Sequence, residues 1–185
     1  MFLTHVPAAR ISKHLTTLVV LQCIIILSFS QTPIGIELYS FRNQFKTDVE
    51  GTLQKISKMG FDEVEGVSTY GLSIDSFNTL LKKYNLTTVS FGAEFSELEK
   101  NSQAVAEKAK ALGTKYVVCF WIPHNGTEFT IENAKKAVDV FNNAGKVLKE
   151  NGISFCYHPH GYEFRPYEQG TLFDYMVKNM KPKYV

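Results

Sequence analysis

Residues 141–164 read FNNAGKVLKENGISFCYHPHGYEF, and the fold can be inferred by working outward from this stretch. The residues up to Glu150 are predicted to end a long helix, and Gly152 is typical of the position that closes one. The next residues, Ile153–His160, are rich in aromatic and apolar side chains and predict a short buried strand of a parallel sheet. His158 and His160 lie at the end of that strand, where polar residues are otherwise unexpected.

The same alternation of strand and helix recurs along the chain, with strand starts 26 to 38 residues apart. Predicted helices begin after a capping residue and several end at a glycine, which are the usual boundary signals. The capping residues are Asp48, Ser73, Ser96 and Thr130, and a last helix is predicted from about Thr171 to Met180. The predicted strands are Ile34–Phe41, Phe61–Val67, Thr87–Ala93, Lys115–Ile122 and Ile153–His160.

Repeated strand–helix units of this kind fit two α/β architectures. One is a TIM-type (β/α) barrel that is incomplete, with about five of eight units, because 185 residues are few for a barrel of about 200 or more. The other is a five-stranded doubly wound parallel sheet. Tyr184 and Val185 resemble the start of a sixth strand. Both architectures place functional side chains at the carboxyl ends of the strands.

The first thirty residues differ from the rest. They contain Arg10 and Lys13 but no acidic residue, and an apolar run covers Leu15–Leu27. These features predict a signal peptide over residues 1–30, cleaved after Ser30, and an exported, periplasmic or extracellular, domain over residues 31–185. The alternative is an uncleaved membrane anchor, although the run is short for a span of about 20 apolar residues.

The charge balance restricts the partners. Lys and Arg total 20 and Asp and Glu total 18, so residues 31–185 carry 18 of each. A neutral domain is not expected to bind nucleic acid or, after signal cleavage, to keep a membrane partner. The expected partner is a small molecule.

His158 and His160 are two residues apart, so on a strand both side chains would face the same side. Together with a carboxylate such as Glu65 or Glu163 they could bind a divalent metal or act as an acid–base pair. The alternative is a pair of structural histidines at the sheet rim.

Other strand ends carry further candidates. Glu65 could be a base or bind a substrate hydroxyl, or it could form a salt bridge. Trp121 could stack on a sugar face or belong to the core. Arg42 could bind an anion or cap a helix, and Glu37 lies in the first strand.

Four stretches resemble motifs of one known family. They are IELYSFR at 36–42, similar to QLYSxR; GTLQKISKMGFDEVE at 51–65, similar to EGTLxxxxxxGYxxVE; FNNAGKVLKENGI at 141–153, similar to LNxxGxxLKxxGI; and YHPHGYEF at 157–164, similar to YHNHxFEF. In this order and spacing they resemble the sugar phosphate isomerase/epimerase family of xylose-isomerase-like TIM barrels.

The resemblance implies an eight-stranded barrel, truncated here after the fifth unit, with a divalent metal (Mn, Zn or Mg) in the full-length family. The resemblance carries the fifth-strand site positions onto His158, His160 and Glu163, and it places Glu37 and Glu65 at the mouth of the same site. Together with the strand-end reasoning, it predicts His160 and Glu163 as metal ligands, His158, His160 and Glu65 as catalytic residues, and Glu37, Trp121 and Arg42 as substrate-binding residues. Pro159 replaces the family's usual Asn, and Glu37 stands where Gln is common.

The implied chemistry is proton transfer next to a carbonyl of a carbohydrate, through an enediolate. Export favours a neutral or oxidised sugar, or a glycoside, over a phosphosugar. The alternative is a non-catalytic barrel fragment or carbohydrate-binding remnant, which could self-associate through its open sheet edges.

Overall fold

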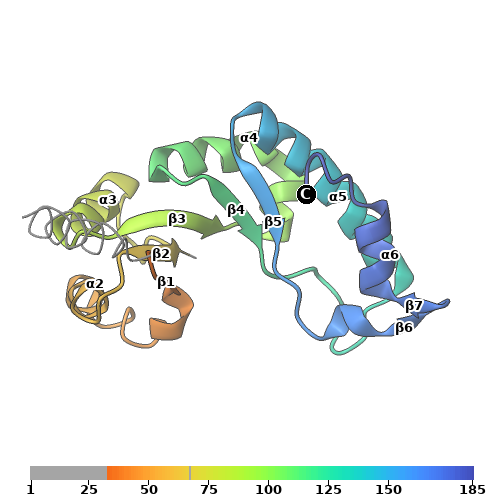
Figure 1. The fold of residues 1–185 in the computed structure, drawn as a ribbon, viewed down its shortest axis with the longest axis horizontal. Coiled ribbons are helices and arrows are strands. Elements are labelled where there is room, and N and C mark those ends of the chain that lie inside the picture. Colours follow the sequence, from red (N-terminus) through yellow and green to blue (C-terminus); the bar gives the residue numbers. More distant parts are fainter. Residues whose placement is uncertain (1–32, 67) are drawn as a thin grey trace, which may run out of the picture. The chain divides into compact units, whose positions relative to one another are not determined.

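A parallel five-stranded sheet forms the centre of the fold in the computed structural model, which describes residues 33–66 and 68–185 (Figure 1). Neighbouring strands pair in chain order, from β1 to β5, and every pair is parallel. The predicted signal peptide lies outside the described residues. None of the described helices combines the length and the apolar content that a membrane span needs. The strands are β1 Gly35–Glu37, β2 Glu63–Gly66, β3 Thr87–Gly92, β4 Tyr116–Cys119 and β5 Ser154–Tyr157.

The helices connect successive strands and pack against one another in chain order, α2 on α3, α3 on α4, α4 on α5 and α5 on α6. Parallel crossovers are almost always right-handed, so strands added in one direction place all their helices on one face of the sheet. A doubly wound sheet instead reverses its strand order and has helices on both faces. The doubly wound alternative is therefore wrong, and the sheet is an open section of barrel wall. The helices are α2 Val49–Lys58, α3 Ile74–Lys83, α4 Phe95–Leu112, α5 Ile131–Glu150 and α6 Leu172–Asn179.

Side chains near the helix starts hold the first turns as the sequence predicts, with one correction. The side chains of Asp48, Ser73 and Thr130 each accept a hydrogen bond from the backbone amide three residues later. The correction concerns α4, which begins one residue before the predicted cap Ser96. Its cap is Glu94, which forms a reciprocal capping box with Glu97.

Three strands end at least three residues earlier than predicted. β1 stops at Glu37 because the chain tightens into a 3-10 helix, η1 (Leu38–Phe41), which buries Leu38 and Phe41. β4 stops at Cys119 rather than Ile122. β5 stops at Tyr157; the His158 amide still donates to the Cys119 carbonyl at 3.0 Å, but the next amide on that edge, that of His160, donates to the Glu163 carboxylate at 3.1 Å instead.

Alternation along β5 divides its side chains between the two faces of the sheet. Phe155 and Tyr157 pack on Phe141 of α5, with ring centroids 5.1 and 5.0 Å apart. Cys156 and His158 therefore point to the opposite face, which the helices leave open. The apolar core lies between the sheet and the helices, so the open face is free to carry polar groups.

The segment after β5 is more irregular than a simple loop. It forms a second 3-10 helix, η2 (Tyr162–Phe164), and a hairpin of β6 (Pro166–Tyr167) and β7 (Gly170–Thr171) that leads into α6. The strand expected at Tyr184 and Val185 does not form. Their amides instead donate to the Lys181 carbonyl, in a turn beside the start of β5.

Replacing Thr130 by alanine is expected to lower the free energy of unfolding by about 1 kcal/mol, because α5 loses its side-chain cap. The Thr130 hydroxyl accepts from the Asn133 amide at 3.3 Å, and the Thr130 amide donates to Asn133 Oδ1 at 2.8 Å. Urea unfolding followed by circular dichroism would measure the change. Thr130→Ser retains the hydroxyl, so it should restore most of the stability; equal losses in both variants would contradict the capping role.

Candidate functional site

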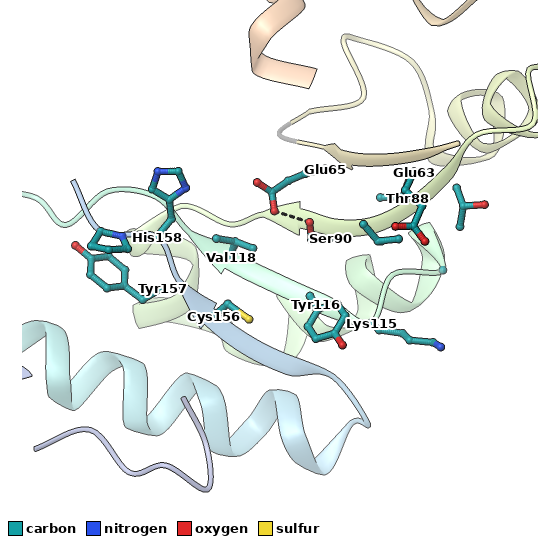
Figure 2. Close-up of a pocket in the computed structure, with 14 residues that line it drawn as sticks. Glu63, Glu65, Thr88, Ser90, Lys115, Tyr116, Val118, Cys156, Tyr157 and His158 are labelled. Carbon is teal, nitrogen blue, oxygen red and sulfur yellow. Dashed lines mark hydrogen bonds between the residues drawn. The ribbon is translucent and has the colours of Figure 1, made fainter. Parts of the chain in front are cut away.

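A groove of about 830 Å³ runs along the open face of the sheet, across β2 to β5. Side chains of every second residue point to this face, among them Glu63 and Glu65 of β2 and Thr88 and Ser90 of β3. The groove is polar at both ends of the strands. Its lining includes Glu63 and Glu65 of β2, Thr88 and Ser90 of β3, Val118 of β4, Cys156 of β5 and His158 (Figure 2).

Glu65 lies in this groove and is held by its neighbour on the next strand. The Ser90 hydroxyl donates to Glu65 Oε2 at 2.5 Å, and Figure 2 shows the two side chains turned toward each other. Glu37 of β1 is the register partner of Glu65 in the paired strands. No lysine or arginine bonds Glu65 among the described residues, so the salt-bridge alternative is not what the structure contains. The carboxylate is fixed in orientation and faces open space.

His158 and His160 come together at the end of β5, although only the backbone before them is strand. Their ring centroids are 5.0 Å apart, with the planes tilted by 33°. His158 lines the groove and contacts the edge of the Phe120 ring, with centroids 5.4 Å apart. The groove therefore has an imidazole at the carboxyl end of the strands, the same end at which Glu65 lies on β2.

An aromatic rim follows the ends of β4 and β5; it consists of Trp121, His124, His160 and Tyr162. The Trp121 ring lies 4.5 Å from His124, 4.9 Å from Tyr162 and 5.7 Å from His160, measured between centroids. Trp121 is 48 % exposed, so it is not a core residue. Sequence reasoning left this choice open because β4 was expected to continue past it.

Glu163 is fully buried, and two protein donors bind its carboxylate. The His160 amide lies 3.1 Å from each carboxylate oxygen, and the Tyr157 hydroxyl donates to Oε1. Burial and this hydrogen bond raise the pKa of Tyr157 far above its usual range, so Tyr157 remains a donor. Glu163 thus holds the backbone that carries the two histidines.

The described residues do not by themselves fit a metal centre. No three side chains of the types that bind metals gather closely enough among them. The His160 ring belongs to the aromatic rim, and the Glu163 carboxylate lies beneath it, bound to Tyr157. The assignment of His160 and Glu163 as metal ligands stays a prediction that needs donors from elsewhere, and we derive no step through a metal.

Arg42 lies at the end of η1. It donates from Nη1 to the Tyr39 carbonyl at 3.1 Å, and its guanidinium carbon lies 4.6 Å from the centre of the Tyr39 ring. Arg42 therefore caps the end of η1, which is one of the two roles expected for it. Anion binding by Arg42 stays a prediction.

Tyr70, Ser90 and Tyr162 are polar residues near the strand ends that sequence reasoning missed. Burial, with a smaller effect of the Glu37 charge, raises the pKa of Tyr70 to about 12. Its hydroxyl has no hydrogen-bond partner among the described residues. The spacing of Thr88 and Ser90, two residues apart in β3, was a usable signal that one face of this strand is polar.

Cys119 is expected to resist alkylation at pH 8 in the folded protein, whereas Cys156 should react slowly. Both are free thiols. Burial raises the pKa of Cys119 to about 12, and Cys156 is only half-buried in the groove, with its pKa raised by burial and by Glu65. Peptide mass spectrometry after iodoacetamide treatment, with and without urea, would measure both sites. Equal labelling of the two in the folded protein would contradict the packing of β4.

Comparison with known proteins supports the fold. No protein-family model matches the chain, and no curated protein matches it. Two sugar phosphate isomerase/epimerase structures from Parabacteroides distasonis ATCC 8503 match with TM-scores of 0.71 and 0.69, at 24 % and 21 % identity over 83 % and 84 % of this chain. A xylose isomerase-like TIM barrel protein from Mycobacterium smegmatis, in complex with magnesium, matches over 69 % of this chain with a TM-score of 0.54 and 17 % identity.

The chain spans 67 % and 65 % of the two Parabacteroides chains and 55 % of the Mycobacterium chain. At these identities the likeness concerns the fold. In the part that the structure describes, the strand order, the one-sided helices and these matches agree. The chain therefore has the fold of the sugar phosphate isomerase/epimerase and xylose-isomerase-like TIM-barrel proteins, and it contains five consecutive β/α units of that fold.

Proposed function

We propose that this chain belongs to a carbohydrate-modifying enzyme that moves a proton at a carbon next to a carbonyl, as isomerases and epimerases do. The observation that carries the proposal is that Glu65, oriented by Ser90, and His158 both line one groove on the open face of a parallel sheet, each toward the carboxyl end of its strand. That end is where enzymes of this fold place their catalytic groups. Two of the structural neighbours are sugar phosphate isomerase/epimerases, which agrees with this class of substrate.

The two groups suit complementary roles. A carboxylate fixed by a hydroxyl donor can take a proton from carbon without having to reorient. An imidazole can give a proton to the carbonyl oxygen, or take one from the neighbouring hydroxyl, as the enediol forms. The proton removed from carbon goes to Glu65 and returns to the neighbouring carbon or to the other face, which gives isomerisation or epimerisation. A divalent metal held partly by groups outside the described residues remains part of our expectation for the whole enzyme.

The lining of the groove favours a neutral sugar over a sugar phosphate. Glu63 and Glu65 face it, and Lys115 is the cationic residue in its described lining. Phosphate groups are usually bound by arginine clusters, lysines or helix N-termini.

Solvent deuterium exchange tests the proposal directly. Protein expressed from its own gene would be incubated with keto- and aldo-sugars in D₂O, with and without added Mn²⁺, Zn²⁺ or Mg²⁺. NMR would then detect loss of the proton next to the carbonyl, even where no product accumulates. Catalysed exchange in at least one sugar is expected. If sugars bound but none exchanged its proton, the enzymatic proposal would be wrong, and the alternative, a carbohydrate-binding protein, would be supported.

We further propose that the protein is exported and that residues 1–30 are removed. Mass spectrometry of the protein from its native source should find a mature chain that begins at Gln31. A chain that retains residues 1–30 and fractionates with membranes would support the anchor instead.

A further inference from the structure

We infer that Trp121 forms a binding site for a second sugar ring, so that the substrate is a disaccharide or another glycoside rather than a free monosaccharide. The inference rests on the proposed function, since it takes Glu65 and His158 as the place where the reacting ring binds. It goes further because it assigns a chain length to the substrate.

The first observation is that a large aromatic ring at the rim of the groove keeps a free surface. Trp121 is 48 % exposed, although it contacts three other rings. His124 lies across the indole with a tilt of 32°, whereas His160 and Tyr162 meet it nearly at right angles. These three contacts do not enclose the ring, since Trp121 remains 48 % exposed. The exposed part of the indole is therefore available to a ligand.

The second observation is that this ring is held in place from below. The Ile122 amide donates to the Tyr162 hydroxyl at 2.9 Å, which ties the end of β4 to the segment after β5. The Tyr162 ring lies 4.1 Å from His124 and 5.8 Å from His160, nearly parallel to the latter. An exposed side chain that has no binding role does not need to be held in one orientation in this way. A rigid, preorganised platform costs a ligand less ordering entropy on binding.

The third observation is the position of the platform relative to the groove. His158 lines the groove, its ring contacts the His160 ring, and the His160 ring contacts Trp121. Trp121 is therefore separated from the imidazole assigned to the reacting sugar by one intervening ring, that of His160. A single sugar held by Glu65 and His158 leaves the indole uncovered. A ring attached to that sugar extends onto it.

The chemistry of the platform fits an uncharged ring. The C–H groups of a pyranose pack on an indole face, and Trp121 is surrounded by aromatic and imidazole rings rather than by lysine or arginine. The edges of the histidine rings supply polar contacts for sugar hydroxyls, whereas the Tyr162 hydroxyl is already bonded to the Ile122 amide. A second monosaccharide unit or an aromatic aglycone has this combination of apolar face and polar edge.

Trp121 is the one tryptophan in the sequence, so its fluorescence reports on this site alone. Monosaccharides would be titrated beside their matched disaccharides, namely glucose with cellobiose, galactose with lactose, and xylose with xylobiose. At least one disaccharide should bind about tenfold more tightly than its monosaccharide and shift the emission. Calorimetry would repeat the titrations with Trp121→Leu, which should lose the disaccharide preference while it keeps the monosaccharide affinity. Phe164→Leu is the control, since Phe164 is equally exposed, at 49 %, but packs on Phe173.

Each outcome separates the two proposals. Equal affinities within all three pairs, or a preference that Trp121→Leu retains, would overturn the second-ring site, whatever the deuterium exchange shows. A preference that depends on Trp121, without exchange in any sugar, would leave the second-ring site standing and remove the catalytic proposal. If exchange were faster with the disaccharide than with the monosaccharide, and if Trp121→Leu removed this difference, both the second-ring site and the catalytic proposal would be supported.

Discussion

Replacing Glu163 by alanine is expected to lower the free energy of unfolding by about 3 kcal/mol, the largest stability effect that we predict for a single side chain. The reason is that Glu163 is fully buried and accepts from two donors, the His160 amide and the Tyr157 hydroxyl. Removing the acceptor leaves both donors without a hydrogen-bond partner in a buried position, where water does not replace the lost bonds. Chemical denaturation monitored by circular dichroism would measure the loss.

Two further variants make the cause of this loss identifiable. Glu163→Gln retains the shape and one acceptor oxygen, so it should cost less than alanine. Glu107→Ala removes an exposed glutamate of α4 and should change stability little. If Glu163→Ala and Glu107→Ala unfolded at the same denaturant concentration, the buried carboxylate would not be holding the end of β5.

The elements of the fold that the sequence predicts well are those with local causes. Asp48, Ser73 and Thr130 cap helices where they were expected, because a cap depends on the few residues around it. The errors lie at the strand ends, where the outcome depends on a neighbouring strand. β5 ends three residues early because the His160 amide, the next donor on the edge that faces β4, bonds the Glu163 carboxylate instead of β4.

The order of the strands could not be derived from periodicity, since a barrel section and a doubly wound sheet have the same alternation. It required either the pairing itself or the four motifs that resemble a known family. The motifs favoured the barrel, and the pairing in chain order from β1 to β5 confirms it. The four family-like motifs thus carried information about the strand order that composition and spacing did not.

The candidate site was predicted only in part for a related reason. His158 and Glu65 are identifiable because polar residues at the ends of apolar strands are unusual. Ser90 and Tyr162 act through contacts with residues 25 and 40 positions away, Glu65 and Ile122, and no local pattern indicates such pairs. These contacts join residues distant in sequence, so they can be identified only from the structure, in which the sheet brings the strands together.

Replacing Glu65 by glutamine is expected to reduce catalysed deuterium exchange by 10²- to 10⁴-fold, which is roughly the range that general acid–base groups contribute. Glutamine is close to the same size and can still accept the hydrogen bond from the Ser90 hydroxyl, so the fold and sugar binding should change little. What it lacks is the capacity to take a proton from carbon. The exchange rate would be measured by NMR, and binding by calorimetry on the same preparations.

Glu63→Gln is the matched control, because it removes the same charge from the same strand. Glu63 lies at the start of β2 and Glu65 two residues further on, toward the end at which His158 lies. A catalytic base must act at a defined atom, whereas a general effect of negative charge in the groove would be shared by both carboxylates. Loss of exchange in Glu65→Gln alone therefore supports proton transfer by Glu65. Equal losses in both variants would mean that the groove needs its charge, and Glu65 would no longer be the base.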